Sequence, residues 1–307
     1  GFPFVRLIVW EMGVTADFGI DMRQVHTISA CQELGINTPA AAERKSPTWD
    51  ANLYLKFADA RMQPALDMMG RLDPENAARP GHAIYDLGCG AGNIARILAQ
   101  RFTGSPVIGI DSSEEMLAKA RSETKDSRVT FATGDLRKFR PGLPPSILYS
   151  NAAYHWVTGH IDLFPDLLKL LPSGGQMAIQ MPRNHEAPSH TLMREAAKAG
   201  PWWDKLKEVH GIPPVAEPAK YYDVLKPFCA QLDVWETIYQ QPLQGKNPVA
   251  QYTAGTGLRP YVQLLDEKQA KDFYETYARL VAAAYPTRPD GITLFPFRRL
   301  FIVARRA

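Results

Sequence analysis

The nine residues YDLGCGAGN, Tyr85 to Asn93, decide the fold class of this chain. They join a short apolar run, AIYDL (Ala83 to Leu87), to a segment with apolar residues at helical spacing, Ala91 to Arg101. A glycine-rich turn between a buried strand and a helix is typical of α/β folds that bind a ligand at the carboxyl end of a parallel sheet. We therefore expect a ligand on this loop, the alternative being a glycine-rich turn that holds none.

The spacing of the glycines distinguishes two kinds of cofactor. Gly88, Gly90 and Gly92 form G-x-G-x-G, and glycine lets the backbone turn tightly and approach a ligand closely. Dinucleotide-binding loops have G-x-G-x-x-G, and their third glycine would fall at Asn93. Asp86 precedes the loop, and a carboxylate suits the ammonium group of a methionine moiety through a charge-assisted hydrogen bond. The loop therefore favours S-adenosylmethionine over NAD.

Strands and helices alternate outward from the loop, as a parallel, doubly wound sheet requires. The other expected strands are Pro106 to Asp111, Val129 to Thr133, Ile147 to Asn151, Gln176 to Met181, Asp233 to Tyr239 and Leu300 to Arg306. The other expected helices are Glu114 to Ser122, Ile161 to Leu171, Ser189 to Lys198 and Asp266 to Ala284. We predict an α/β fold with a doubly wound, seven-stranded, mostly parallel sheet of Rossmann-like type. Residues 1–46 are expected to form a loosely ordered extension, and 47–307 one domain with helical cap insertions at about 182–230 and 240–298.

Polar residues follow the expected strands at their carboxyl ends, where open sheets bind ligands. Asp111 ends the second strand 21 residues after Gly90, which is where such folds place the acid that binds ribose hydroxyls. The alternative for Asp111 is the N-cap of the following helix. Asp135 and Leu136 are expected beside the adenine, although a polar residue can also simply begin a loop. Ser112, Met116 and Asn151 complete the expected cofactor set.

The composition excludes several other classes of function. The net charge of +3 is spread over 35 basic and 32 acidic side chains, without the basic stripe that nucleic-acid binding requires. Cys31, Cys89 and Cys229 lie far apart, so neither a disulfide framework nor a metal site is expected. No apolar run approaches the ~18 residues of a membrane span. We expect a cytoplasmic protein, a monomer rather than an oligomer.

Five segments in order, DLGCGAG, GIDSS, GDL, NAAYHW and LLPSGG, resemble class I S-adenosylmethionine-dependent methyltransferases. Outside them, Tyr54 to Met69, Met181 to Ala197, Thr253 to Leu265 and Phe297 to Arg306 resemble the trans-aconitate methyltransferase family. The resemblance implies transfer of the sulfonium methyl group to a carboxylate of trans-aconitate or a similar small polycarboxylic acid, giving a monomethyl ester. Lys198 to Val215 departs from the family pattern. Methylation of another small acceptor and non-catalytic binding of S-adenosylmethionine therefore stay open.

Residues for the acceptor are expected beyond the fourth strand and in the cap. His155 and Trp156 are expected nearest the chemistry, His155 as a donor to the acceptor and Trp156 as a wall of the pocket, and Tyr154 beside them is expected to contact the acceptor. A buried structural histidine is the alternative for His155. Arg183 and Arg259 are expected to hold carboxylates, because a guanidinium group offers a planar pair of donors.

Two further sets of residues carry an open alternative. Tyr54 and Arg61 resemble an N-terminal lid over the cofactor, and they could equally lie on a helix surface. The arginines of the last strand are expected to be mostly solvent-exposed, since side chains alternate along a strand. They are Arg298, Arg299, Arg305 and Arg306.

Overall fold

The computed structural model describes residues 58–77, 79–209 and 214–307. All of them belong to one unit, Trp49–Ala307. The expected extension over residues 1–46 and the predicted lid residue Tyr54 lie outside the described residues, and so does the side chain of Arg61.

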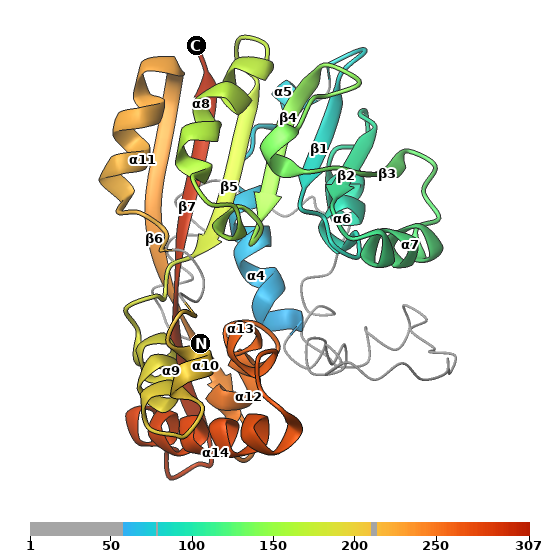
Figure 1. Ribbon diagram of the computed structural model, residues 1–307. Helices are drawn as coiled ribbons and strands as arrows, with labels where there is room; N and C mark the ends of the chain where they lie inside the picture. The colour runs from blue at the N-terminus through green and yellow to red at the C-terminus, as the bar shows by residue number, and fades with distance from the viewer. Residues whose placement is uncertain (1–57, 78, 210–213) are drawn as a thin grey trace. The chain divides into compact units, whose positions relative to one another are not determined.

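Seven strands form one sheet in the order β3-β2-β1-β4-β5-β7-β6 (Figure 1). They are β1 (Ala83–Leu87), β2 (Val107–Asp111), β3 (Val129–Thr133), β4 (Pro145–Asn151), β5 (Gln176–Pro182), β6 (Cys229–Leu243) and β7 (Thr293–Arg306). Strands β1 to β5 pair in parallel, whereas β7 runs antiparallel to both β5 and β6. The predicted doubly wound, mostly parallel sheet is confirmed. The strand order reverses between β1 and β4, and a crevice at the carboxyl ends of the strands is expected there.

Helices cover both faces of the sheet (Figure 1). One apolar cluster joins the first face to α4 (Ala58–Met69) and α6 (Asn93–Arg101), with α7 (Glu114–Glu123) beside them on β2 and β3. A second cluster joins the opposite face to α8 (His160–Leu170) and α11 (Pro218–Leu225). The short helices α5 (Pro74–Ala77), η1 (Leu136–Lys138), η2 (Tyr154–Trp156) and η3 (Lys226–Phe228) occupy connections. Burial of both faces explains the near-continuous apolar runs in β1 and β4.

A helical cap with its own apolar cluster lies beyond the carboxyl ends of β4 and β5 (Figure 1). It contains α9 (Pro188–Lys198), α10 (Trp203–Leu206), α12 (Pro248–Ala254), α13 (Arg259–Val262) and α14 (Glu267–Ala284). The paired strands β6 and β7 run from the sheet into this cap. The sequence predicted only the sheet portion of these two strands. One part of the β6–β7 pair packs against the helices that cover the sheet, and the other part packs against the cap. No single alternating pattern of apolar residues therefore covers the whole length of these strands.

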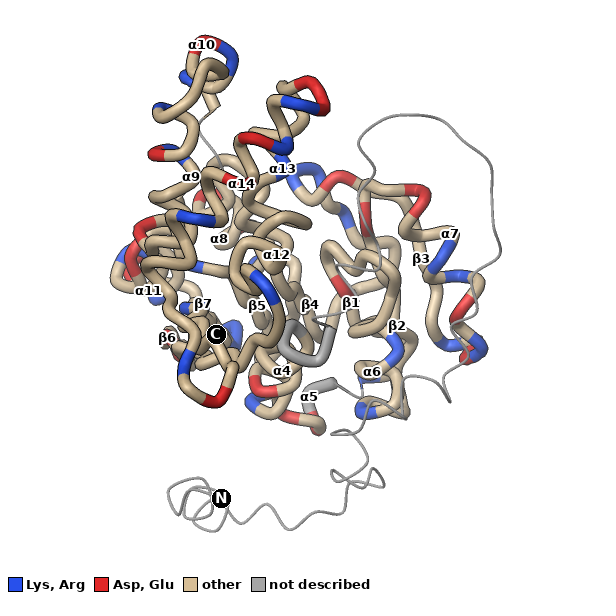
Figure 2. The backbone as a smooth tube through the Cα atoms, turned by 90° about the horizontal axis from the view of Figure 1, so that it is seen from below, with Lys and Arg blue, Asp and Glu red and all other residues tan. Residues whose placement is uncertain are grey.

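Two surface properties bear on the classes of partner. Lys and Arg residues are interspersed with Asp and Glu along the described chain (Figure 2). None of the helices within the described ranges is long and apolar enough to cross a membrane.

Candidate functional site

The glycine loop after β1 needs glycine for both its conformation and its packing. Gly88, Gly90 and Gly92 have φ angles of 79°, 52° and 76°, in the left-handed region that other residues seldom adopt. A Cβ atom on Gly88 would lie 2.2 Å from the Cβ of Ala153, and one on Gly92 would lie 2.6 Å from the Phe131 ring. Gly88 and Gly92 therefore lie against their neighbours with no room for side chains, whereas at Gly90 it is the backbone conformation that favours glycine.

Asp86 lies directly before this loop and is almost completely buried. Its Oδ2 atom has no hydrogen-bond partner among the described residues. Burial, and next the charge of Asp111, raise the pKa of the Asp86 carboxyl to about 7. A buried carboxylate oxygen without a donor is costly, and a ligand ammonium group would satisfy both its charge and its hydrogen bonding.

Asp111 at the end of β2 holds the loop from the other side. Its Oδ2 accepts from Gly90 N at 2.8 Å, and its Oδ1 accepts from Ser113 N at 2.9 Å. Ser113 is the N-cap of α7, its hydroxyl accepting from Met116 N, so the N-cap alternative for Asp111 is wrong. A carboxylate has about four acceptor positions, and two of those on Asp111 remain for ribose hydroxyls.

The other predicted cofactor residues surround the loop unevenly. The Met116 methyl group lies 3.4 Å from the place a Gly90 Cβ would take, and Leu136 Cδ1 lies 3.6 Å from that of Gly88. Both therefore offer apolar contact beside the loop, whereas Ser112 is exposed. Asp135 caps η1 and pairs with Arg137 at 2.6 Å. Hydrogen bonds from Arg137 lower the pKa of the Asp135 carboxyl to about 2, so an adenine amine would share this carboxylate with Arg137.

Four polar side chains line the same face of the sheet at its carboxyl edge. Each is two residues away, along its strand, from a buried apolar residue of the α4–α6 cluster. Side-chain alternation therefore places all four on the face of the sheet that α4 and α6 cover. The pairs are Ile84 and Asp86, Tyr149 and Asn151, Ala178 and Gln180, and Phe301 and Arg299. The edge therefore continues from the cofactor loop across β4 and β5 to β7.

The sequence analysis missed Gln180 and misjudged Arg299, which it expected to be solvent-exposed with the other terminal arginines. Arg299 is only 3% exposed, and its Nη1 donates to Gln180 Oε1 at 3.3 Å. Two buried amide atoms nearby, Asn151 Oδ1 and Gln180 Nε2, have no hydrogen-bond partner among the described residues. The position of Arg299 between Phe297 and Phe301 in the strand alternation was the available signal.

His155 and Trp156 in η2 differ sharply in exposure. His155 is buried, and its Nδ1 has no hydrogen-bond partner among the described residues. Burial, with the charge of Arg299 next, lowers the pKa of His155 to about 3, so the ring is neutral at neutral pH. Trp156 is 49% exposed, with its ring centroid 4.9 Å from that of His155. This arrangement suits the predicted roles, with neutral His155 as a hydrogen-bonding group and Trp156 as an aromatic wall of the pocket.

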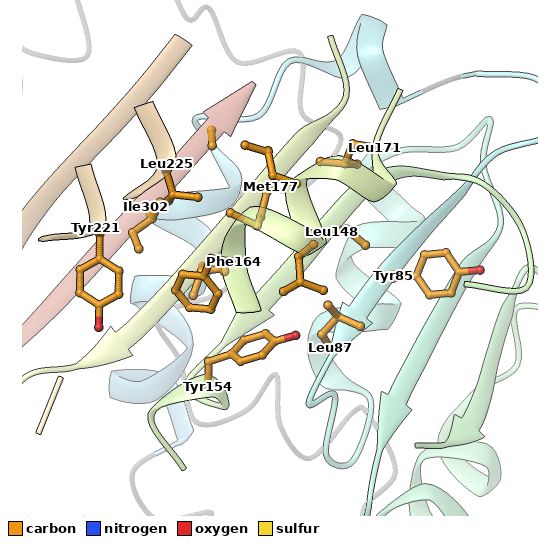
Figure 3. Close-up of a cluster of buried hydrophobic side chains, with 14 of the residues drawn as sticks. Tyr85, Leu87, Leu148, Tyr154, Phe164, Leu171, Met177, Tyr221, Leu225 and Ile302 are labelled. Atoms are coloured by element: carbon orange, nitrogen blue, oxygen red, sulfur yellow. The ribbon is translucent and has the colours of Figure 1, made fainter. Parts of the chain in front are cut away.

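Tyr154 lies in the apolar core. Its ring is fully buried and packs edge-on against Phe164 at 5.2 Å. Figure 3 shows it among Phe164, Leu148 and Leu87. The Tyr154 hydroxyl is buried and has no hydrogen-bond partner among the described residues. The contact of Tyr154 with the acceptor therefore stays a prediction.

The two arginines predicted as carboxylate clamps have other surroundings. Arg183 follows the alternation of Met181 and so points to the α8–α11 face. There it is buried and forms ion pairs with Glu217 and Glu236, so two carboxylates already match its charge. Arg259 is exposed at the start of α13. The structure therefore does not bring either guanidinium group to the buried edge beside Gln180.

Comparisons with known proteins agree with this architecture. Residues 84–175 match the methyltransferase domain family. A trans-aconitate 2-methyltransferase from Azoarcus sp. (strain BH72) is 43% identical over 260 residues, which is 85% of this chain and 100% of that protein. One from Paracidovorax citrulli (strain AAC00-1) is 42% identical, covering 84% of this chain and 98% of its own length.

A solved structure supports the fold independently. The YcgJ protein from Bacillus superposes with a TM-score of 0.50 at 16% identity, covering 80% of this chain and 99% of that one. The seven-stranded sheet, the glycine loop with its buried acid and the full-length similarity to curated relatives agree with one another. This chain belongs to the trans-aconitate 2-methyltransferase family, a family of S-adenosylmethionine-dependent methyltransferases.

Proposed function

We propose that this protein transfers the methyl group of S-adenosylmethionine to a carboxylate of trans-aconitate, forming a monomethyl ester. The observation that carries the proposal is the buried Oδ2 of Asp86, which has no hydrogen-bond partner among the described residues and lies beside a glycine loop with three left-handed residues. The acceptor follows from the names of the relatives, which are about 40% identical over nearly their whole length.

The residues around the loop fit the methyl donor. Asp86 would receive the ammonium group, Asp111 has acceptor positions left for the ribose, and Met116 and Leu136 flank the loop with apolar surface. Bound there, the donor supplies an electrophilic methyl carbon on a sulfonium ion. Asp86 and Asp111 come from the adjacent strands β1 and β2. One carboxylate would therefore hold the amino-acid part of the donor and the other its nucleoside part, at a separation that the sheet fixes.

The reaction needs little proton chemistry from the protein. A carboxylate is ionised at neutral pH, since its reference pKa is about 4. One of its oxygens forms the new carbon–oxygen bond while the sulfur–carbon bond breaks and S-adenosylhomocysteine leaves. The task is therefore to orient the acid, which can contribute on the order of 7 to 11 kcal/mol in well-aligned systems. Neutral His155 is suited to donate a hydrogen bond, not to remove a proton.

Turnover with labelled S-adenosylmethionine tests the proposal. Trans-aconitate is the acceptor, with cis-aconitate and isocitrate as comparisons, and mass spectrometry identifies the ester. We expect trans-aconitate to be the best of the three acids. Methylation of an unrelated acceptor alone would replace the substrate, and cofactor binding without turnover on any carboxylic acid would favour a non-catalytic binding protein.

A further inference from the structure

We propose that Arg299 binds a carboxylate of the acceptor and that Gln180 is the positioning residue that aims it. This inference rests on the proposed function, because the acceptor class comes from there. The sequence alone pointed to Arg183 and Arg259 for this role, and we place it instead on the last strand.

Arg299 lies where the sheet meets the cap. It pairs in register with Pro182, the last residue of β5, and with Thr237 of β6. Its side chain points to the face that carries Asp86, Asn151 and Gln180, since it stands two residues from Phe301 of the α4–α6 cluster. The guanidinium group is therefore buried on the side of the sheet to which the cofactor loop belongs.

Two contacts fix the direction of the guanidinium group. Its Nη1 donates to Gln180 Oε1 at 3.3 Å, and its Cζ lies 4.6 Å from the centroid of the Phe297 ring. A guanidinium group held by a ring and an amide keeps its fork in one orientation. The same Gln180 amide carries an Nε2 with no hydrogen-bond partner among the described residues. Arg299 and Gln180 Nε2 together can offer donors to both oxygens of one carboxylate.

The charge of the guanidinium group also acts on His155, a predicted acceptor residue. The positive charge of Arg299 reaches His155, where it helps to lower the ring's pKa. Arg183 lies on the opposite face of the sheet, where it pairs with Glu217 and Glu236. Charge-assisted hydrogen bonds inside a protein are stronger than those at its surface. A buried guanidinium group at this edge suits a non-reacting carboxylate of a polycarboxylic acid better than exposed Arg259.

Substitutions at Arg299 give the first test. Arg299→Lys keeps the charge and loses the fork, and Arg299→Gln loses both. We expect the KM for trans-aconitate to rise about 10- to 100-fold in each, as removal of a hydrogen bond to a charged group predicts. The affinity for S-adenosylmethionine should stay within about threefold of wild type. Arg298→Lys is the matched control, because that neighbouring side chain is exposed.

Gln180→Glu is the second variant and leaves Arg299 untouched. It replaces an amide NH₂ by oxygen at nearly constant volume and places an internal carboxylate on the guanidinium group. We expect the KM for trans-aconitate to rise by a similar factor, while kcat changes less and the protein stays folded because the new pair is matched in charge. A merely structural role of Gln180 would lower stability or kcat without this selective rise in KM.

The outcomes separate the two proposals. If wild type turns over trans-aconitate and both Arg299→Lys and Gln180→Glu keep the wild-type KM, the Arg299 assignment is overturned and the proposed function stands. If Arg299→Gln fails to fold and so loses cofactor binding, the KM of Gln180→Glu for trans-aconitate decides: a selective rise supports the assignment, and a wild-type value overturns it. Wild type that binds S-adenosylmethionine but never methylates trans-aconitate removes the acceptor, and the Arg299 inference is then overturned with it.

Discussion

The two ends of the proposed site are built in different ways. The cofactor end is made by successive strands, loops and helices between β1 and η1, and much of it is backbone. The proposed acceptor end is made by side chains from β5 and β7, which lie as far apart in sequence as Gln180 and Arg299. The comparison shows why the first is visible as a sequence motif and the second is not. The residues of a loop keep a fixed spacing in the sequence, whereas side chains on different strands become neighbours only after the strands pair.

The largest effect is expected from breaking the backbone-built end. In Gly88→Ala the new Cβ would meet Ala153 at 2.2 Å, with the residue at a positive φ angle. The left-handed conformation alone costs about 1 to 2 kcal/mol, and the clash forces the loop to move. We expect the affinity for S-adenosylmethionine, measured by calorimetry, to fall at least about 100-fold.

A matched control for Gly88→Ala exists at Gly142, in the loop before β4. A Cβ atom added at Gly142 would meet nothing within 4 Å beyond its chain neighbours, and the φ angle of Gly142 is not positive. Gly142→Ala should leave cofactor affinity unchanged. Wild-type affinity in Gly88→Ala would show that the ligand does not need this loop conformation.

A smaller loss is expected when only the charge at the cofactor end is removed. Asp86→Asn keeps the shape of the side chain but cannot pair with an ammonium group. Cofactor affinity should fall about 10- to 100-fold, the value of a hydrogen bond to a charged group. The KM for trans-aconitate, measured at saturating cofactor, should change little. A loss confined to the acceptor would place Asp86 at the other end of the proposed site.

The pKa of about 7 at Asp86 predicts a pH dependence of the same end. The carboxyl must be ionised to bind the ammonium group, so cofactor affinity should fall below neutral pH by up to about tenfold per unit. The folded state also holds this proton more tightly than the unfolded chain, so without cofactor Asp86 contributes less stability as pH rises from 3.8 to about 7. Thermal unfolding and calorimetry across this range measure both trends, and Asp86→Asn should abolish them.

The smallest effect is expected at Asp135, whose carboxylate Arg137 already engages. Asp135→Ala should weaken cofactor binding only about two- to fivefold, because this partly exposed carboxylate is already shared with Arg137. Arg137→Ala should leave affinity equal or slightly higher, since it returns the acceptor to the ligand. An effect of Asp135→Ala as large as that of Asp86→Asn would show that the adenine amine dominates recognition.

Most strands of the sheet could be predicted from runs of apolar residues, because these strands are buried on both faces. β1 and β3 have the predicted bounds, and β4 and β5 differ from prediction by two residues or fewer at each end. The paired strands β6 and β7 were predicted too short, since their outer halves pack in the cap, where Phe295 and Phe297 meet cap helices. A short stretch of sequence does not show that one strand packs against different elements along its length.

The sequence by itself determined the class of fold, the cofactor and the residues of the glycine loop, because these depend on contacts within a few residues and on φ angles that glycine alone adopts readily. Only the tertiary structure decided which arginine is buried on the face of the sheet that carries Asp86. Side chains at even spacing share a face of a strand, but which face is buried beside the ligand depends on register with partners far away in the chain. That is why Arg183 pairs with Glu217 on one face while Arg299 joins Gln180 on the other.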